Sequence, residues 1–311
     1  MLIAMMCVSA VVAVLQVSGG TFRNPLINVV PGSVSGTFAN RNHFALFIAI
    51  GCVLLPVWAT GTKTRRPWKL PVALAALPIL LMVSLASGSR SGAILTALGI
   101  GMGLWIARHG VATAAARFDR KTLIILGLAC LAALIAAVAA SVSFDRAASI
   151  ERAMSLQSGE DLRGRALPWV LELVKSYFPL GAGFGTFDPA YRIIEPDQLL
   201  QNAYFNHAHN DIVEVAFEGG VLAIGVLLAV MAWAARASYR TWRIPDASPE
   251  QLLARAGSCV LLLVVLASAL DYPARTPLVM AVCVIAALWL ERAERSGRKG
   301  SPQRSQRAAR A

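Results

Sequence analysis

The densest group of ionisable side chains in the sequence is the segment HAHND at residues 207–211. Glu214 and Glu218 follow Asp211 at spacings of three and four, so three carboxylates would share one face of a helix. An imidazole can take a proton from a hydroxyl group near neutral pH, and neighbouring carboxylates can orient its ring. Two histidines with carboxylates could also hold a metal ion, and polar groups here could simply cap and hydrate a helix end. The residue types therefore favour acid–base chemistry and leave the other two interpretations open.

Three other segments place cationic side chains beside apolar runs. They are SGSRSG (87–92) with Arg90, RGR (163–165), and GTFANRNH (36–43) with Arg41. A guanidinium can bind a diphosphate through two parallel hydrogen bonds, which makes each segment a candidate anion site. The structural alternatives are an arginine that reaches the lipid headgroups, a solvated charge pair and a helix cap, respectively.

The overall composition indicates a membrane protein. The chain has 311 residues, of which 57% are hydrophobic and 15% charged, and its mean hydropathy is +0.61. Soluble domains average about 45–50% apolar and about 25% charged residues, so an ordinary cytosolic enzyme, a disordered chain and a disulfide scaffold are excluded. The formal net charge of +12 would suggest nucleic acid for a soluble protein. In a membrane protein basic residues instead mark cytoplasmic loops, and no nucleic-acid partner is expected.

Eight apolar segments are long enough, or nearly so, to cross a bilayer, which requires about 20 residues. They cover residues 2–18, 43–60, 70–86, 91–107, 122–142, 212–235, 252–270 and 278–290. We therefore predict an all-α polytopic membrane protein with about eight transmembrane helices. Its predicted parts are five spans in 1–142, a large external loop in 143–211, three spans in 212–291 and a basic, disordered tail in 292–311.

The distribution of basic residues predicts the orientation. Arginine and lysine are concentrated in the loops at 61–69 and 108–121, in the turn around 236–255 and in the C-terminal tail. The short loops on the opposite side hold Arg23, Arg41, Arg90 and Arg275. By the positive-inside rule the basic side is cytoplasmic, so both termini are expected inside and the loop at 143–211 outside.

The external loop is too long to be a simple connection and is expected to have structure of its own. Residues 167–178 place apolar side chains at helical spacing and predict an amphipathic helix that Pro179 ends. The segment LGAGFGTF (180–187) follows. We interpret it as a tight bend because no strand precedes it, as a nucleotide-binding glycine motif requires.

One arrangement would use all of these segments. External arginines would hold a diphosphate, a histidine beside them would activate a hydroxyl nucleophile, and the amphipathic part of the loop would cover the reaction. The substrate would then be a lipid-linked phosphate that enters sideways from the outer leaflet of the membrane.

Four motifs occur in the order seen in the O-antigen ligase and polymerase family, which the chain resembles. They are GTFANRNHFA (36–45), SGSRSG (87–92), LRGRALPWVLELVKSYFPLGAGFGTF (162–187) and HAHNDIVEVAFEGGVLAIG (207–225). The run His209-Asn210, nine residues and Gly220 is similar to the His-Asn…Gly pattern of the ligases. Ala223 stands where that pattern repeats a glycine, and the chain has fewer N-terminal spans than is usual in the family. Ligase, polymerase and an N-terminally shortened member therefore stay open.

The resemblance implies a GT-C-like, metal-independent glycosyltransferase that needs no cofactor and lies in the bacterial inner membrane. Its donor would be a glycan on undecaprenyl diphosphate at the periplasmic face, and its acceptor a hydroxyl of lipid A–core, of another glycan or of a protein. The resemblance assigns Arg90 and Arg165 to the diphosphate and His209 to the general base, with inversion at the anomeric carbon. The residues assigned to shaping the substrate site are Arg41, Asn210, Asp211 and Glu218.

Two other functions fit part of the pattern. A transporter of a small solute or ion would place polar residues and broken helices near the middle of the membrane, often in repeated halves. Here the polar residues gather on one external side and no internal repeat is visible, which favours the enzyme. An inactive partner in a polysaccharide export complex is the other alternative.

Overall fold

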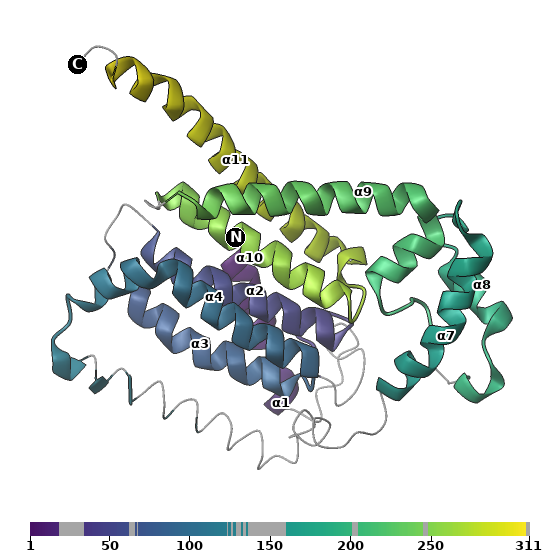
Figure 1. The fold of residues 1–311 in the computed structure, drawn as a ribbon. Helices are drawn as coiled ribbons and strands as arrows, with labels where there is room; N and C mark the ends of the chain where they lie inside the picture. The colour runs from purple at the N-terminus through teal and green to yellow at the C-terminus, as the bar shows by residue number, and fades with distance from the viewer. Residues whose placement is uncertain are drawn as a thin grey trace.

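The computed structural model describes residues 1–18, 34–61, 66, 68–122, 160–200, 205–244 and 248–308, with a few positions between 124 and 135. In these ranges the fold is entirely helical (Figure 1), which confirms the predicted all-α class for the described part of the chain. The helices are α1 (Leu2–Ser18), α2 (Arg41–Thr60), α3 (Lys69–Ala86), α4 (Arg90–Ala115), α7 (Glu160–Tyr177), α8 (Phe187–Ile194), α9 (Asp211–Trp242), α10 (Pro249–Ser268) and α11 (Pro277–Ala308), with short 3-10 helices η1 (Asp197–Leu199) and η2 (Pro273–Arg275).

Five of the described helices are long and apolar enough to cross a membrane, namely α2, α3, α4, α9 and α10. Helix α1 is apolar but shorter, and α11 is apolar only in its N-terminal part. These helices are those of a polytopic membrane protein. The fifth predicted span, at 122–142, lies largely outside the described residues.

Helix α2 forms the centre of the bundle, and every residue from 43 to 57 is buried. Helix α4 packs against it in parallel, and glycines of α4 face the backbone of α2. A Cβ atom at Gly99 would lie 2.4 Å from the carbonyl oxygen of Ala49. One at Gly103 would lie 2.5 Å from the carbonyl oxygen of Cys52. Glycine therefore allows the two backbones to approach closely, as is common between membrane helices.

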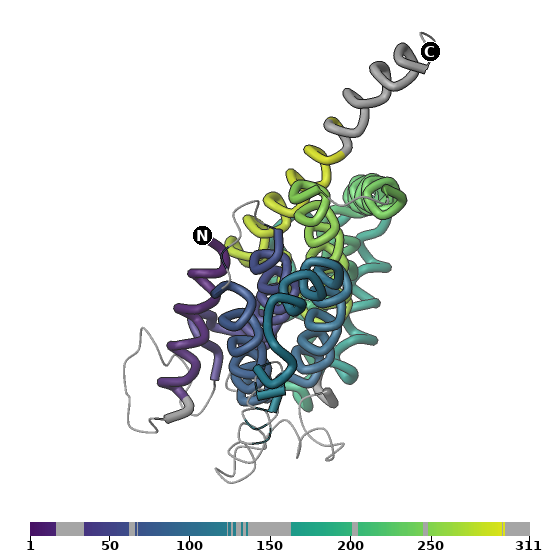
Figure 2. The backbone as a smooth tube through the Cα atoms, turned by 90° about the vertical axis from the view of Figure 1, so that its left-hand side faces the viewer, coloured from purple at the N-terminus to yellow at the C-terminus, as the bar shows by residue number. Residues whose placement is uncertain are grey.

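The first residues of α2, α4, α9 and α11 and the last residues of α1, α3 and α10 lie at one end of the bundle, called the outer end below (Figures 1 and 2). The side chain of Gln16, near the end of α1, hydrogen-bonds the backbone of Gly36, shortly before α2. The side chain of Ser268, at the end of α10, hydrogen-bonds Asp211, the first residue of α9. Successive helices therefore run in opposite directions from α1 to α4 and again from α9 to α11.

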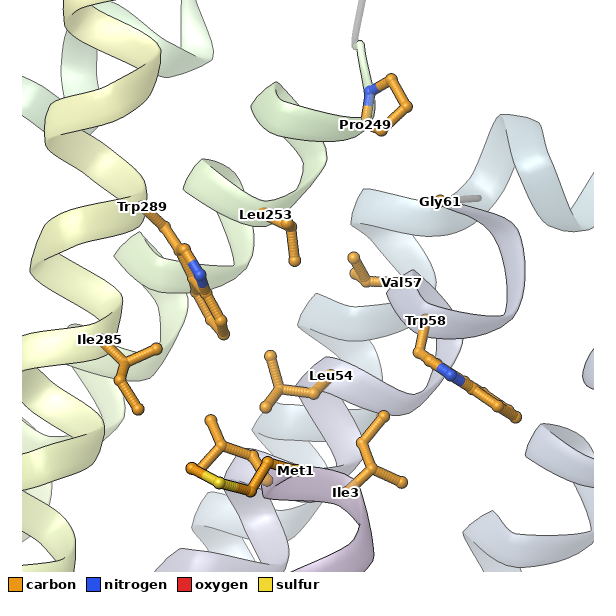
Figure 3. Close-up of a pocket in the computed structure, with 11 residues that line it drawn as sticks. Met1, Ile3, Leu54, Val57, Trp58, Gly61, Pro249, Leu253, Ile285 and Trp289 are labelled. Carbon is orange, nitrogen blue, oxygen red and sulfur yellow. The ribbon is translucent and has the colours of Figure 1, made fainter. Parts of the chain in front are cut away.

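A pocket of about 420 Å³ lies at the opposite end of the bundle, between α1, α2, α10 and α11 (Figure 3). Its lining is mostly apolar and includes Leu54, Trp58, Leu253, Ile285 and Trp289. Because the polar clusters described below lie at the outer end, this pocket takes no part in the candidate site.

Helices α7 and α8, η1 and the first turns of α9 form a small outer domain beside the bundle (Figure 1). In its core, the rings of Phe187 and Tyr191 stack with their centroids 5.6 Å apart. Phe217 of α9 meets Phe187 edge-on at 5.9 Å. The helix predicted at 167–178 is present as α7, which begins earlier than expected and ends just before Pro179.

Helix α9 is kinked at Gly220, where φ is 57°. The sequence predicts one continuous span over 212–235. In the structure the part before the kink packs into the outer domain, and its Phe217 is fully buried there. The most exposed apolar side chains of the helix come after the kink, from Val221 onward. The carboxylates of α9 therefore lie before the straight part of the helix, whose apolar side chains are exposed. The apolar residues between the carboxylates, such as Phe217, face a protein core instead.

The C-terminal tail also differs from expectation. Its composition predicts disorder from residue 292, whereas α11 continues as a helix to Ala308. Glu291 and Arg295 form an ion pair one helical turn apart. Such pairs, together with alanine, arginine and glutamine residues, favour a helix even where charge is high.

Candidate active site

Asp271, in the loop between α10 and α11, is the centre of a hydrogen-bonded cluster at the outer end. Its buried carboxylate accepts hydrogen bonds from Nδ1 of His209 at 2.9 Å and from Nδ2 of Asn42 at 2.6 Å. Nδ2 of Asn40 donates from 3.3 Å, and the guanidinium of Arg163 lies 3.6 Å away. Burial alone would raise the pKa of Asp271, but the hydrogen bond from His209 and the Arg163 charge lower it well below its ordinary range. The carboxylate is therefore ionised and held in one orientation.

Asn210 positions His209 by connecting α9 to the α10–α11 loop. Its side-chain oxygen caps α9 by accepting hydrogen bonds from the first backbone N–H groups of the helix. Its Nδ2 donates to the carbonyl oxygen of Ala269 at 3.0 Å. His209 has a φ of 50°, a left-handed conformation that is uncommon for residues with side chains and is concentrated at functional sites. In this conformation its ring meets Asp271.

The contact with Asp271 decides which nitrogen of His209 can act as a base. The Asp271 carboxylate accepts a hydrogen bond from the Nδ1–H group, so the lone pair of the neutral ring is on Nε2. Within the part of the chain that the structure describes, Nε2 has no hydrogen-bond partner, and the side chain is 18% exposed. This is the arrangement of a general base with an orienting carboxylate.

Tyr272 occupies the space between three imidazoles. Its ring centroid lies 4.2 Å from that of His207 and 5.0 Å from those of His43 and His209. Burial and the neighbouring charge of Asp271 raise the pKa of Tyr272, so the phenol stays neutral. Its uncharged ring packs against the three imidazoles. Over the described ranges, no group of three or more His, Cys, Asp or Glu side chains is arranged to hold a metal ion. The His209–Asp271 pair is the arrangement that the acid–base interpretation requires.

A second cluster surrounds Arg275 in the same loop. Its guanidinium lies 2.8 Å from Glu218, 3.3 Å from Glu214 and 3.6 Å from Asp211. These are the three carboxylates that share one face of α9. Carboxylates so close together need partners, and the structure shows that their common partner is a loop arginine 57 residues after Glu218.

Each carboxylate oxygen of the second cluster has a contact, but Asp211 Oδ1 meets only the Arg275 Nε, at 3.6 Å, and that buried Nε makes no hydrogen bond within the described residues. Besides Arg275, the groups that contact these oxygens are Ser268 Oγ and the backbone N–H of Ala274 for Asp211, the backbone N–H of Ala208 and Nδ1 of His207 for Glu214, and the backbone N–H of Gly185 for Glu218. Glu214 and Glu218 are almost completely buried. The cluster therefore joins the start of α9 to the α10–α11 loop and to the outer domain.

The arginines assigned from the sequence lie as follows. Arg41 and Arg90 are the first residues of α2 and α4, and the side chains of Asn40 and Ser89 cap these helices. Because α2 and α4 are parallel, both arginines lie at the outer end with Asp271. Arg165 is exposed on α7.

Arg163 contacts the Asp271 cluster directly. It donates a hydrogen bond to the carbonyl oxygen of Leu270 at 3.0 Å and lies beside Asp271. The sequence places it two residues before Arg165 in the same RGR segment, without a role of its own. Residues two positions apart on a helix point in nearly opposite directions, so Arg163 and Arg165 cannot both contact the Asp271 cluster.

Sequence reasoning gave no role in the site to Asp271, Tyr272 or Arg275. The available signal was the short segment DYPARTP, which places an acidic and a basic residue between two apolar spans. Asn40, Asn42 and His43 belong to a motif that the sequence did single out, but the candidate substrate residue there was Arg41, and the asparagines were expected only to cap a helix. Asn40 is indeed that cap, and it also bonds Asp271.

The fold and this site are those of a polytopic helical membrane protein with a hydrogen-bonded histidine–aspartate pair at one end of its bundle. A family model described as O-antigen ligase matches residues 73–230, just over half of the chain. The chain therefore belongs to the O-antigen ligase family, as its motifs indicate. In its general class it is an O-antigen ligase-type membrane glycosyltransferase. No curated protein matches the sequence.

The family match covers only part of the site. It includes SGSRSG, α7 and the His209 segment, but neither the start of α2 nor the loop that holds Asp271. Asn42 and Asp271 nevertheless meet at 2.6 Å, and Asp271 binds His209. Segments on both sides of the matched region thus complete the site.

Proposed function

We propose that this protein transfers a glycan from undecaprenyl diphosphate to an acceptor hydroxyl at the periplasmic face of the bacterial inner membrane. The observation that supports this most strongly is the pair of His209 and Asp271 at the outer end of the bundle, with Nε2 of the imidazole available. The basic loops at the other end favour cytoplasmic termini and a periplasmic outer end. The fold of this protein is proposed to be related to that of GT-C-like transferases.

In the proposed reaction, the acceptor hydroxyl gives its proton to Nε2 of His209 as its oxygen attacks the anomeric carbon of the donor sugar. The bond from that carbon to the diphosphate oxygen breaks, and undecaprenyl diphosphate leaves with the electron pair. Attack opposite the leaving group inverts the configuration. Asp271 stabilises the imidazolium that forms. No cofactor or metal ion takes part in this scheme.

The diphosphate would be bound by Arg90 and Arg165, and Arg41 would help to shape the substrate site. The positions of Arg41 and Arg90, at helix starts on the same side of the bundle as Asp271, support these roles. Guanidinium groups suit a diphosphate because their planar forks match its oxygens. For Asn210, Asp211 and Glu218, the hydrogen bonds within the protein support an indirect role, in which they shape the site by holding the start of α9.

The central test replaces His209 in proteoliposomes supplied with a lipid-linked glycan donor and an acceptor. His209→Ala should lower the rate of glycan transfer on the order of 10²–10⁴-fold, which is the usual contribution of a general base. His207→Ala is the matched control, because His207 belongs to the same segment but contacts Glu214 and not Asp271. Near-normal transfer by folded His209→Ala would reject the proposed base.

The acceptor can be identified by profiling glycolipids in a strain that lacks the gene. Loss of glycan from lipid A–core with normal chain length would indicate a ligase. Shortened chains that are still attached would indicate a polymerase, and a change in protein-linked glycan would indicate a protein acceptor. A normal profile in all three fractions would contradict the proposed transfer and favour a transporter or an inactive partner of an export complex.

A further inference from the structure

The glycine-rich turn at residues 179–186 is attached to α9 at its kink. The carbonyl oxygen of Pro179 accepts a hydrogen bond from the backbone N–H of Val221 at 2.9 Å. The backbone N–H of Gly183 donates to the carbonyl oxygen of Glu218 at 2.8 Å. The backbone N–H of Gly185 donates to the Glu218 side chain, also at 2.8 Å. These bonds hold the turn at one height relative to the straight part of α9.

The turn and the kink fit together only because both lack side chains at their contact. A Cβ atom at Gly220 would lie 2.1 Å from the carbonyl oxygen of Pro179. A Cβ atom at Gly181 would lie 2.5 Å from the carbonyl oxygen of Glu218. Both glycines also have positive φ, which other residues rarely adopt. The tight bend expected from the sequence is therefore fixed at a defined position on α9.

Two apolar side chains of this turn are largely exposed. Leu180 is 86% exposed and Phe184 is 74% exposed, whereas Phe187, just after the turn, is 1% exposed in the core of the outer domain. A large exposed leucine and phenylalanine on one rigid turn form an apolar patch, and such patches mark contact surfaces.

The patch continues onto the membrane-facing surface of α9. Val221 and Leu222, the first residues after the kink, are 51% and 80% exposed and begin the apolar stretch of this span. The Phe184 ring lies 3.0 Å from the position that a Cβ of Gly219 would occupy. Figure 1 shows α7 and α8 beside the outer end of α9, where this attachment is made. Lipid that contacts Leu222 therefore borders the turn.

We propose that the turn at 179–186 inserts Leu180 and Phe184 into the outer leaflet of the membrane. The partner is the lipid surface itself, at the boundary between headgroups and acyl chains, where apolar and aromatic side chains are favoured. Since Glu218 binds both Gly185 and Arg275, the insertion also sets the height of the Arg275 cluster and of the adjoining His209 segment relative to the bilayer. The outer domain is thereby held at the membrane surface from which a lipid-linked substrate would enter.

The test measures depth by spin labelling in phospholipid vesicles, in a variant whose native cysteines are replaced. Labels are placed at Leu180→Cys and Phe184→Cys, at Leu222→Cys as the lipid reference and at Glu172→Cys on α7 as the water reference. Oxygen concentrates in the bilayer and a nickel chelate, present on both sides, stays in water. The proposal expects labels at 180 and 184 to collide more with oxygen and less with the chelate than the label at 172, as the label at 222 does.

Two results would overturn the proposal. If labels at both 180 and 184 respond to the chelate like the label at 172, the turn lies in water. If both are shielded from oxygen and the chelate alike, protein covers the turn. Glycan transfer is not measured, so neither result depends on the proposed enzymatic function, and the two labelled positions report independently should one variant fail to fold.

Discussion

The two charged clusters at the outer end share the α10–α11 loop and the start of α9, yet they are built in opposite ways. In the Arg275 cluster, every oxygen of three carboxylates has a partner. In the Asp271 cluster, the carboxylate is saturated but the imidazole that it orients keeps Nε2 available, and Arg163 is 36% exposed. One continuous segment, HAHNDIVEVAFE, therefore contains both a reactive group and the residues that position it.

The clusters should also differ in what their loss costs. Removing Arg275 would leave three buried carboxylates without their common cation, which is strongly unfavourable. Removing His209 would leave Asp271 with the donors Asn40 and Asn42 and the Arg163 guanidinium. We therefore expect stability to depend on the first cluster and glycan transfer on the second.

The largest expected effect is that of Arg275→Met, which removes the charge but keeps much of the apolar stem. It should lower the free energy of unfolding by about 3–5 kcal/mol, because breaking a buried ion pair leaves uncompensated charge. The measurement is thermal unfolding in detergent, followed by size-exclusion chromatography. Arg163→Met is the control and should unfold close to the unmodified protein, since its guanidinium is partly exposed. Equal stability of the two variants would remove the distinction between the clusters.

The next effect compares one carboxylate from each cluster by the same change to an amide. Asp271→Asn should lower transfer by about 10²-fold or more, because an amide no longer stabilises the imidazolium of His209. Glu218→Gln should instead lower stability by about 1–3 kcal/mol through its buried contacts with Arg275 and Gly185. Transfer rates per folded molecule and unfolding curves are measured for both. The comparison fails if Glu218→Gln reduces transfer as strongly as Asp271→Asn while remaining stable.

A smaller effect is expected for Arg90→Lys at the outer end of α4. A lysine keeps the charge but cannot form two parallel hydrogen bonds with a diphosphate. The KM for the lipid-linked donor should rise about tenfold, equivalent to the loss of one charged hydrogen bond. Arg108→Lys should leave the KM for the donor unchanged, because Arg108 lies towards the other end of α4, away from the candidate site, with its guanidinium over the ring of Trp105. An unchanged donor KM in Arg90→Lys would argue against diphosphate binding there.

The smallest effect concerns pH. Unfolded Asp271 takes up a proton near its ordinary pKa of about 4, whereas the folded carboxylate has a lower pKa. Its contribution to stability is therefore complete above about pH 4 and is lost progressively below that value. Between pH 7 and pH 5, any loss of thermal stability in the unmodified protein should therefore also occur in Asp271→Asn. A stability transition near pH 5 that disappears in Asp271→Asn would contradict the lowered pKa.

Sequence patterns were sufficient for features that depend on local composition. Apolar runs of the right length identified α2, α3, α4 and α10 as spans, and helical spacing identified α7. The position of His209 beside a helix cap could also be read from HAHND, since capping depends on neighbouring residues. The glycine-rich turn was recognised as a bend for the same reason.

Which charged side chains meet depends on how the helices pack. Asp271 lies 62 residues from His209 and 229 residues from Asn42, and no local pattern encodes such pairings. Likewise, hydropathy predicted one span over 212–235, because an apolar residue such as Phe217 has the same hydropathy whether it faces lipid or a protein core. Local chemistry thus specified the helices and the reactive residue types, and packing at the outer end determined which imidazole received a carboxylate and which carboxylates received an arginine.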